Sequence, residues 1–455
     1  MKRLVGILLF AVILSGFVSA KINLPSSEDI KLKNGLTVRV INRPELPLFT
    51  IEMTFRAGSI YDPVGQEGLA NLCNEMLMRG TKSRSAKQIA EEISFGGGTL
   101  SNFCGRESAG FTGEFLAENG VKGFQILSDI LLNSAFANDE LIKIRNRTVA
   151  GLESRYENPS SIATEKIFAE VLGNSRYAHI PAGNISAVSL LNRDDIIEFY
   201  RKTYAPDNCL LVVCGDIDKK TVKKWIERYL GDWNGICGIT PAQTKFTPVT
   251  DKQILILDKQ DATQTQIRLG NIGLSMKHPD YIPFETARTA FAGSFTSRLV
   301  NEIRVKRGLT YGVSMRSSRY TPGGIVYIST FTKNESVGEV LEIILSETNR
   351  IQTEAVPDSE LIGTINYRTG LYPLSFETND DLAGIYTNLW FYGLNKDHYE
   401  KYQENMRQMT PADIIQITNR YFPYENYRIV LVGKADEIKS QVEKFGPVTV
   451  KPLVE

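Results

Sequence analysis

The residues whose spacing could do chemistry lie in the stretch 68–81, which reads GLANLCNEMLMRGT. Asn71, Asn74 and Glu75 lie at i, i+3 and i+4, so a helix would place them on one face. This is the frame of H-x-x-E-H, in which two histidines bind zinc and the glutamate activates a water molecule. Asparagines replace the first histidine and the glutamate, and Glu75 replaces the second histidine. Because an amide is a poor zinc ligand and not a base, we expect this chain to bind no metal here and to hydrolyse no peptide unaided.

The composition is that of a soluble globular protein of more than one domain. Of the 455 residues, 42% are apolar and 23% are charged, and this length exceeds what one ordinary core organises. Lys+Arg and Asp+Glu each number 52, so the overall charge favours neither a nucleic acid nor an anionic membrane as partner.

The N-terminus predicts export. Lys2 and Arg3 precede an apolar run over residues 4–14, and the small residues at 18–20 form a cleavage site. We therefore predict a signal peptide over residues 1–20, and a periplasmic location if the source is a Gram-negative bacterium. An uncleaved anchor is the alternative, although the apolar run is short for a membrane span. No later stretch is long and apolar enough to cross a bilayer, so we expect no membrane span after signal removal.

An internal repeat organises the rest of the chain. The segments 195–215 and 413–433 both begin with Asp-Ile-Ile, carry Asn at their fourteenth position and end with an apolar run and Gly. Each segment predicts a capped helix followed by a buried strand. We therefore predict an N-terminal domain over residues 21–235, a polar, Pro-containing linker over 236–250 and a C-terminal domain over 251–455.

Within each half, the pattern predicts strands followed by helices. Residues 36–41 and 49–56 alternate as strands do, and a helix is expected over about 67–78. The predicted fold is α+β, with two homologous domains that are each a mostly antiparallel sheet with helices packed on one face. The other face of such a sheet could line a cavity between the halves.

A series of short motifs, weak singly, recurs in a fixed order along the chain. They are Asn34–Leu36, Arg56–Asp62, Gly68–Thr81, Phe95–Gly98, Pro181–Gly183, Tyr204–Asn208, Gln264–Arg268, Gly293–Leu299 and Arg304-x-x-x-Gly308-Leu-x-Tyr311. With these motifs the chain resembles the insulinase/pitrilysin-like zinc peptidases, peptidase family M16, and especially their short bacterial, mitochondrial-processing-peptidase type. The resemblance implies a LuxS/metallohydrolase-like duplication.

The resemblance also implies a catalytic pair, Arg304 and Tyr311, that the second domain of the family contributes. An arginine supplies fixed donors and a tyrosine supplies a hydroxyl on a rigid ring, so together they can hold a substrate carbonyl and stabilise the oxyanion. The alternative is that Arg304 is an exposed helix cation and Tyr311 an aromatic residue at the start of a strand.

Three other positions follow from the same resemblance. Glu153 occupies the place of the third zinc ligand of the family, so Asn71, Glu75 and Glu153 could form an oxygen-rich pocket that suits calcium or magnesium better than zinc. The alternative is that Glu153 is a leftover helix carboxylate. Gly97 and Asn102 are predicted to bind substrate, because their segment leads into the strand whose edge pairs with an extended peptide.

The function predicted from these features is that of one subunit of a pair. The chain would be the non-zinc-binding, Arg/Tyr-bearing subunit of an exported heterodimeric zinc peptidase that degrades peptides in a closed chamber. An H-x-x-E-H-bearing subunit would supply the zinc and the general base. One alternative is a non-catalytic peptide-binding or scaffold homologue, and another is hydrolysis by this chain alone with some other metal.

Overall fold

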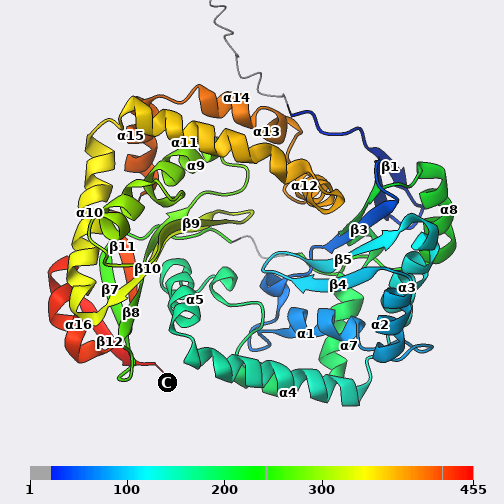
Figure 1. Cartoon of the computed structure of the whole chain (residues 1–455). Coiled ribbons are helices and arrows are strands. Elements are labelled where there is room, and N and C mark those ends of the chain that lie inside the picture. Colours follow the sequence, from blue (N-terminus) through cyan, green and yellow to red (C-terminus); the bar gives the residue numbers. More distant parts are fainter. Residues whose placement is uncertain (1–21, 241–243, 423, 454–455) are drawn as a thin grey trace, which may run out of the picture.

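The computed structural model describes residues 22–240, 244–422 and 424–453. The predicted signal peptide lies outside these residues. Two six-stranded sheets lie on opposite sides of the molecule, and helices surround them (Figure 1). Within the described ranges, no helix combines the length and apolar character needed to cross a membrane.

The N-terminal sheet has the strand order β1-β2-β6-β3-β5-β4. Its strands are β1 (Glu28–Lys31), β2 (Thr37–Asn42), β3 (Leu48–Phe55), β4 (Thr99–Cys104), β5 (Ala109–Leu116) and β6 (Cys209–Gly215). Only the β2–β6 pair is parallel. The predicted buried strand is β6, which lies inside the sheet and is buried along its whole length.

The C-terminal sheet repeats this arrangement in the order β12-β7-β11-β8-β10-β9. Its strands are β7 (Lys252–Asp258), β8 (Gln264–Gly273), β9 (Val313–Arg319), β10 (Gly324–Lys333), β11 (Tyr427–Gly433) and β12 (Val448–Pro452). Five strands of one sheet correspond in order and direction to five strands of the other. The edge strand differs, because β1 is the first strand of the N-terminal half whereas β12 is the last strand of the C-terminal half. The predicted α+β duplication is confirmed.

The helices repeat as well. The N-terminal half has α1 (Leu69–Leu77), α2 (Ala86–Phe95), α3 (Gly120–Asn133), α4 (Asn138–Ser154), α5 (Pro159–Leu172), α6 (Ile185–Leu190), α7 (Arg193–Thr203) and α8 (Lys219–Leu230). The C-terminal half has α9 (Tyr281–Ala292), the π-helix η6 (Val300–Val305), α10 (Val337–Thr353), α11 (Asp358–Leu371), α12 (Asn379–Phe391), α13 (Asp397–Glu400), α14 (Tyr402–Arg407), α15 (Pro411–Tyr421) and α16 (Ala435–Val442). The predicted helix starts in the two repeats are both capping boxes, at α7 and at α15.

The two halves exchange a helix. In each half, its own helices cover one sheet face, as predicted. The other face, which the sequence suggested could line a cavity, is instead covered by a helix of the opposite half: α12 packs on β3 and β6, and α5 packs on β8 and β11. The residues of β6 point alternately to the two faces. Leu211 and Val213 join the core of the N-terminal half, whereas Leu210 and Val212 pack with α12 residues.

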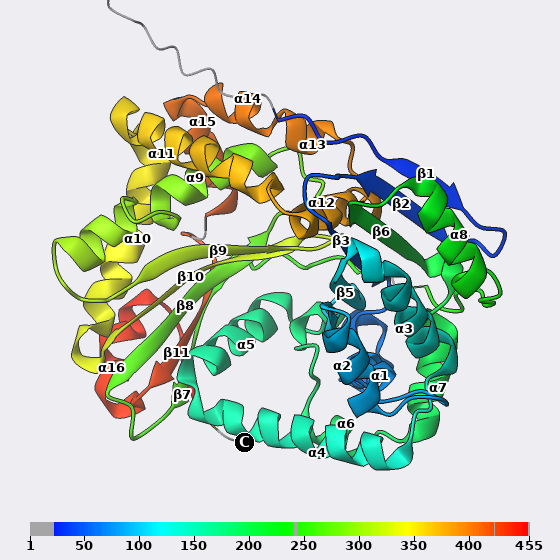
Figure 2. The same ribbon diagram turned by 45° about the vertical axis from the view of Figure 1, so that its right-hand side comes forward.

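The β9–β10 hairpin is a second contact between the halves. Figure 2 shows this hairpin extending toward the N-terminal half. At its tip, the Thr321 N–H donates to Glu107 Oε1 at 2.9 Å. Glu107 is 6% exposed and also accepts a hydrogen bond from the Tyr177 hydroxyl at 2.8 Å. The buried carboxylate of Glu107 therefore joins the two halves.

Candidate functional site

The helix with the degenerate motif, α1, is fixed at its N-terminus by a buried carboxylate. Asp62 Oδ2 accepts from the Gly68 N–H at 2.8 Å, and Oδ1 accepts from the Ala70 N–H at 2.7 Å. These N–H groups are among those that a helix start leaves unpaired. Burial raises the pKa of Asp62 to about 7, although both backbone hydrogen bonds oppose this shift. The Arg56–Asp62 motif therefore ends in the cap of α1.

Two glycines bring the start of α1 against the 181–183 segment. Gly183 has a φ of 78°, and a Cβ there would lie 2.0 Å from the Glu67 carbonyl oxygen. Gly68 has a φ of 105°, and its Cβ would lie 2.8 Å from the Ala182 carbonyl oxygen. Only glycine fits such backbone conformations at so close an approach. The motif that begins at Gly68 and the Pro181–Gly183 motif therefore pack directly against each other.

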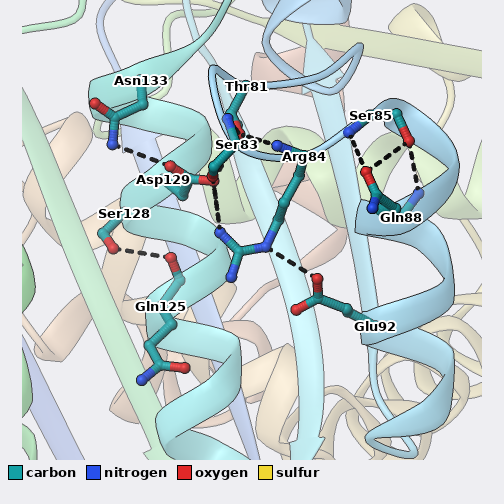
Figure 3. A network of polar contacts seen from close by, with 10 residues as sticks. All are labelled: Thr81, Ser83, Arg84, Ser85, Gln88, Glu92, Gln125, Ser128, Asp129 and Asn133. Atoms are coloured by element: carbon teal, nitrogen blue, oxygen red, sulfur yellow. Dashed lines mark hydrogen bonds and ion pairs between the residues drawn. The ribbon is translucent and has the colours of Figure 1, made fainter.

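The loop after α1 is fixed by Asp129 of α3 (Figure 3). Asp129 Oδ2 accepts from Thr81 Oγ1 at 2.7 Å, Ser83 Oγ at 3.1 Å and Arg84 Nη1 at 2.7 Å, and Oδ1 accepts from Asn133 Nδ2 at 3.0 Å. Burial favours the neutral acid, but these four donors lower the pKa of Asp129 overall. Thr81, the last residue of the motif, and the loop that follows it are therefore held by an ionised carboxylate of the chain itself.

Asn74, at the position of the general base, is fully buried and fully hydrogen-bonded. Its Nδ2 donates to the Gly110 carbonyl oxygen at 3.3 Å and to the Tyr204 hydroxyl at 3.0 Å, and its Oδ1 accepts from Asn102 Nδ2 at 2.7 Å. Its exposure is 0%. The amide thus uses its donors and its acceptor to join α1 to β4 and β5. It has no contact with solvent through which a water could be activated.

The two predicted substrate-binding residues differ in what they contact. Asn102 uses its amide to donate to Asn74, so its side chain positions α1. Gly97 lies in the turn before β4 with a φ of 64°, where a Cβ would be 2.8 Å from Leu116 Cδ1. The backbone of β4 itself is at the edge of the sheet. Because an edge strand has unpaired N–H and C=O groups, peptide addition at β4 stays a prediction.

Glu75 faces an arginine. Its Oε1 accepts from Asn71 Nδ2 at 3.3 Å, and its Oε2 forms an ion pair with Arg147 of α4. Glu153, about 1.7 turns further along α4 than Arg147, is exposed. The Glu75 carboxylate is thus already paired with a guanidinium of the same chain. It is therefore not free to bind a cation in the predicted oxygen-rich pocket of Asn71, Glu75 and Glu153.

The residues at the degenerate motif do not fit zinc. In the part of the chain that the structure describes, no three His, Cys, Asp or Glu side chains are grouped so as to hold a metal ion. Zinc prefers histidine and cysteine ligands, and here an amide and a paired carboxylate take the histidine positions.

Arg304 and Tyr311 lie on the surface of the C-terminal half. Arg304 belongs to η6, and its guanidinium lies 4.6 Å from the centre of the Phe295 ring. Tyr311 precedes β9 and is 82% exposed, and Phe295 and Val305 nearby in sequence are 67% and 62% exposed. Among the described residues, neither the Arg304 guanidinium nor the Tyr311 hydroxyl has a hydrogen-bond or ion-pair partner.

The pair does not meet α1 of its own chain. It adjoins the Val313 end of β9, whereas the far end of β9 leads to the hairpin tip that contacts Glu107. Seven residues of extended strand separate these ends by about 20 Å. The structure therefore brings Asn71, Asn74, Glu75 and Asn102 together, and leaves Arg304 and Tyr311 apart from them.

Arg147 is the site residue that sequence reasoning missed. It lies six positions before Glu153 and reads as one of several cations on a polar helix. A signal was present in charge: Glu75 stands at a histidine position of the motif, and a half-buried carboxylate there is stabilised by a nearby cation. Sequence alone does not say which helix position supplies it.

The comparisons with known proteins agree with this fold. Residues 37–181 match the family model described as insulinase (peptidase family M16), and residues 190–366 match the model described as the peptidase M16 inactive domain. The chain belongs to peptidase family M16. It is an M16 homologue in which the metal and general-base positions are replaced.

Relatives and solved structures extend over most of the chain. A Rickettsia bellii protein named an uncharacterized zinc protease is 28% identical over 395 residues, which cover 86% of this chain and 94% of that protein. An uncharacterized zinc protease of Bacillus subtilis is 22% identical over 90% of this chain and 98% of its own length. The crystal structure of a peptidase M16 inactive domain from Pseudomonas fluorescens has a TM-score of 0.84 at 21% identity, covering 90% of this chain and 98% of that one.

Proposed function

We propose that this protein is the Arg/Tyr-bearing, non-zinc-binding subunit of an exported heterodimeric M16 zinc peptidase. The observation that carries the proposal is the contrast between its two sites. Glu75 and Asn74 are bound by Arg147, Gly110, Tyr204 and Asn102, whereas Arg304 and Tyr311 keep free donors on the surface. Free donors at the surface are available to a second protein.

The division of labour follows from chemistry. The partner, an M16 subunit with an intact H-x-x-E-H, would hold the zinc ion, which polarises the substrate carbonyl and the attacking water. Arg304 would donate hydrogen bonds to the substrate carbonyl oxygen and stabilise the negative charge that develops on it. The Tyr311 hydroxyl would donate to the same oxygen from its rigid ring. Exposed Phe295 and Val305 would pack against the partner.

Peptides are the substrate class that the proposal implies. Peptides short or unfolded enough to enter a chamber between the two subunits would be cleaved, and one of them could add as a strand to the edge of β4. Export rests on the signal peptide predicted over residues 1–20.

The experiment mixes this protein with the M16 subunit encoded by a neighbouring reading frame, if that subunit has an intact H-x-x-E-H. Cleavage of a quenched fluorescent peptide is expected from the mixture and not from this protein alone, and a chelator should abolish it. Arg304→Ala and Tyr311→Phe are each expected to lower kcat/KM by about 100-fold, the loss that follows removal of one oxyanion donor.

Matched controls separate this role from general damage. Arg307→Ala removes an exposed arginine three residues from the half-buried Arg304, and Tyr367→Phe removes another exposed tyrosine hydroxyl. Both should keep full activity in the mixture. Full activity in the Arg304→Ala and Tyr311→Phe mixtures would show that the pair has no catalytic role.

A non-catalytic, peptide-binding homologue is the second candidate. The hydrogen bonds of Asn74 and the ion pair of Glu75 favour it, because they stabilise α1 without any metal. If the protein binds extended peptides and binds the H-x-x-E-H subunit without conferring cleavage, this second function replaces the first.

A further inference from the structure

Three guanidinium groups surround one carboxylate in the C-terminal half. Glu285 of α9 is 4% exposed, and its Oε2 lies 2.7 Å from Arg288 Nη2 and 3.6 Å from Arg368 Nη2. Its Oε1 lies 3.9 Å from Arg319 Nη1. Across the described residues, Glu285 is the one carboxylate within ion-pair distance of these arginines, so the group keeps an excess of positive charge.

Two of these arginines have donors to spare. Arg368 donates to the Tyr402 hydroxyl through Nε at 3.1 Å and Nη2 at 2.6 Å. The Arg319 Cζ lies over the Tyr281 ring, 4.0 Å from the ring centre. Arg319 Nη1 is buried without a hydrogen-bond partner among the described atoms. A buried N–H of a charged group is costly to leave unpaired, so this geometry suits an added acceptor.

Both arginines line a cavity of about 520 Å³. Its walls also carry the aromatic rings of Tyr281, Tyr372 and Phe376. Small-molecule sites have this range of volume, a mainly apolar or aromatic lining and a few convergent polar groups. The cavity therefore suits an anionic group attached to an apolar body.

The same cavity contains carboxylates from α12. Asp380 and Asp381, in the first turn of that helix, line it together with Asn388. Asp381 accepts hydrogen bonds from Thr378 in the capping box, whereas Asp380 accepts from Thr50 of β3 with Oδ1 alone, at 2.6 Å. From Asp380 to Asn388 the helix axis extends about 12 Å along the cavity.

We propose that this cavity binds a short free peptide of two or three residues as a zwitterion. The peptide carboxylate would accept from Arg319 and Arg368, and its ammonium group would donate to Asp380 Oδ2. An apolar side chain would pack against Tyr372 and Phe376. Two or three extended residues span about 7–10 Å, which the cavity accommodates. The inference stands apart from the proposed function, since Arg304 and Tyr311 do not line this cavity.

The site has a consequence for the arrangement of the halves. The carboxylates belong to α12, which packs on the sheet of the N-terminal half, and the guanidiniums belong to β9 and α11 of the C-terminal half. A peptide held by both would fix α12 against β9 and α11. Bound peptide is therefore expected to slow amide exchange in α12.

The test is calorimetric titration of the purified protein with Ala-Ala-Phe at pH 7, without any partner subunit. Binding to the wild-type protein is expected, weakened at least tenfold when the peptide is C-terminally amidated and at least threefold when it is N-acetylated. Arg319→Gln should weaken binding of the free peptide at least tenfold, and Asp380→Asn at least threefold. Arg201→Gln, at an exposed position on α7, is the matched control and should bind as the wild type does.

The modified peptides test the wild-type protein, so the result does not depend on whether a variant folds. No binding of Ala-Ala-Phe at 5 mM would overturn the proposal. Equal affinity for the free and the amidated peptide would also overturn the proposal, because the arginines would then not bind the peptide carboxylate.

Discussion

Arg268 of β8 donates to both the carbonyl and the hydroxyl oxygen of Ser160 in α5, at 3.1 and 2.7 Å. This contact joins the C-terminal sheet to the helix that the N-terminal half contributes to it. The guanidinium also donates to Thr164 Oγ1 and to the carbonyl oxygens of Ile267 and Thr330, so all five of its N–H groups are used. Arg268 is 2% exposed, and burial lowers its pKa to about 10, so it remains a cation at neutral pH.

Replacing this arginine should loosen α5. Arg268→Met removes all five donors and leaves buried carbonyl oxygens unpaired, which is expected to lower the free energy of unfolding by about 1–3 kcal/mol. Urea denaturation measures the loss, and hydrogen exchange should show faster exchange in α5. Arg316→Met, at an exposed position on β9, should leave both measurements unchanged. Equal stability of the two variants would mean that the Arg268 contacts contribute nothing net.

The sequence predicted what local patterns encode. The two capping boxes and the buried β6 strand follow from residue types at fixed spacing, and their recurrence predicted the duplicated α+β fold. The exchange of α5 and α12 was not predictable in this way. The apolar residues Leu210 and Val212 indicate that the second face of β6 is buried as well, but they do not indicate which helix packs on it. The partner Arg147 of Glu75 was missed for the same reason, because it is defined by the packing of α4 on α1.

The cap of α1 should make stability depend on pH. The pKa of Asp62 is raised by burial from 3.8 to about 7 in the folded protein. Between these values the folded state binds the proton more strongly than the unfolded state, so the free energy of unfolding falls as pH rises toward 7 and levels off above it. This single group changes stability by up to about 4 kcal/mol.

Asp62→Asn removes that titration. An amide cannot accept from both the Gly68 and Ala70 N–H groups, so the variant should be less stable than the wild type by about 1–3 kcal/mol at pH 5, where the wild-type carboxyl is neutral. Urea denaturation of both proteins from pH 5 to 8 measures the difference. The difference in the free energy of unfolding between the two proteins should become smaller as pH rises. A difference that stays constant would show that Asp62 does not titrate in this range.

The contact between Gly183 and Glu67 predicts a large steric effect from one methyl group. Gly183→Ala would place a Cβ 2.0 Å from the Glu67 carbonyl oxygen at a φ of 78°. We expect a loss of at least about 3 kcal/mol, because backbone on both sides must move. Gly151→Ala is the control, since a Cβ there meets nothing within 4 Å inside α4. That variant should gain about 0.5–1 kcal/mol from helix propensity, and thermal unfolding distinguishes the two.

Asn74 provides the sharpest test of why the general-base position lost its carboxylate. Asn74→Asp keeps the shape but replaces the amide that donates to the Gly110 carbonyl oxygen by an oxygen that faces it. With 0% exposure, the new carboxylate would be buried without a cation, so we expect a loss of about 2–4 kcal/mol at pH 8. Burial raises the pKa of such a group, so the folded variant retains its proton and the loss should shrink as pH falls toward 5. Urea denaturation at the two pH values measures this loss in the free energy of unfolding, and Asn146→Asp, on α4, serves as a control for the added charge. If the loss of free energy of unfolding is the same at pH 5 and pH 8, position 74 tolerates a charge, and the absence of a carboxylate there has another cause.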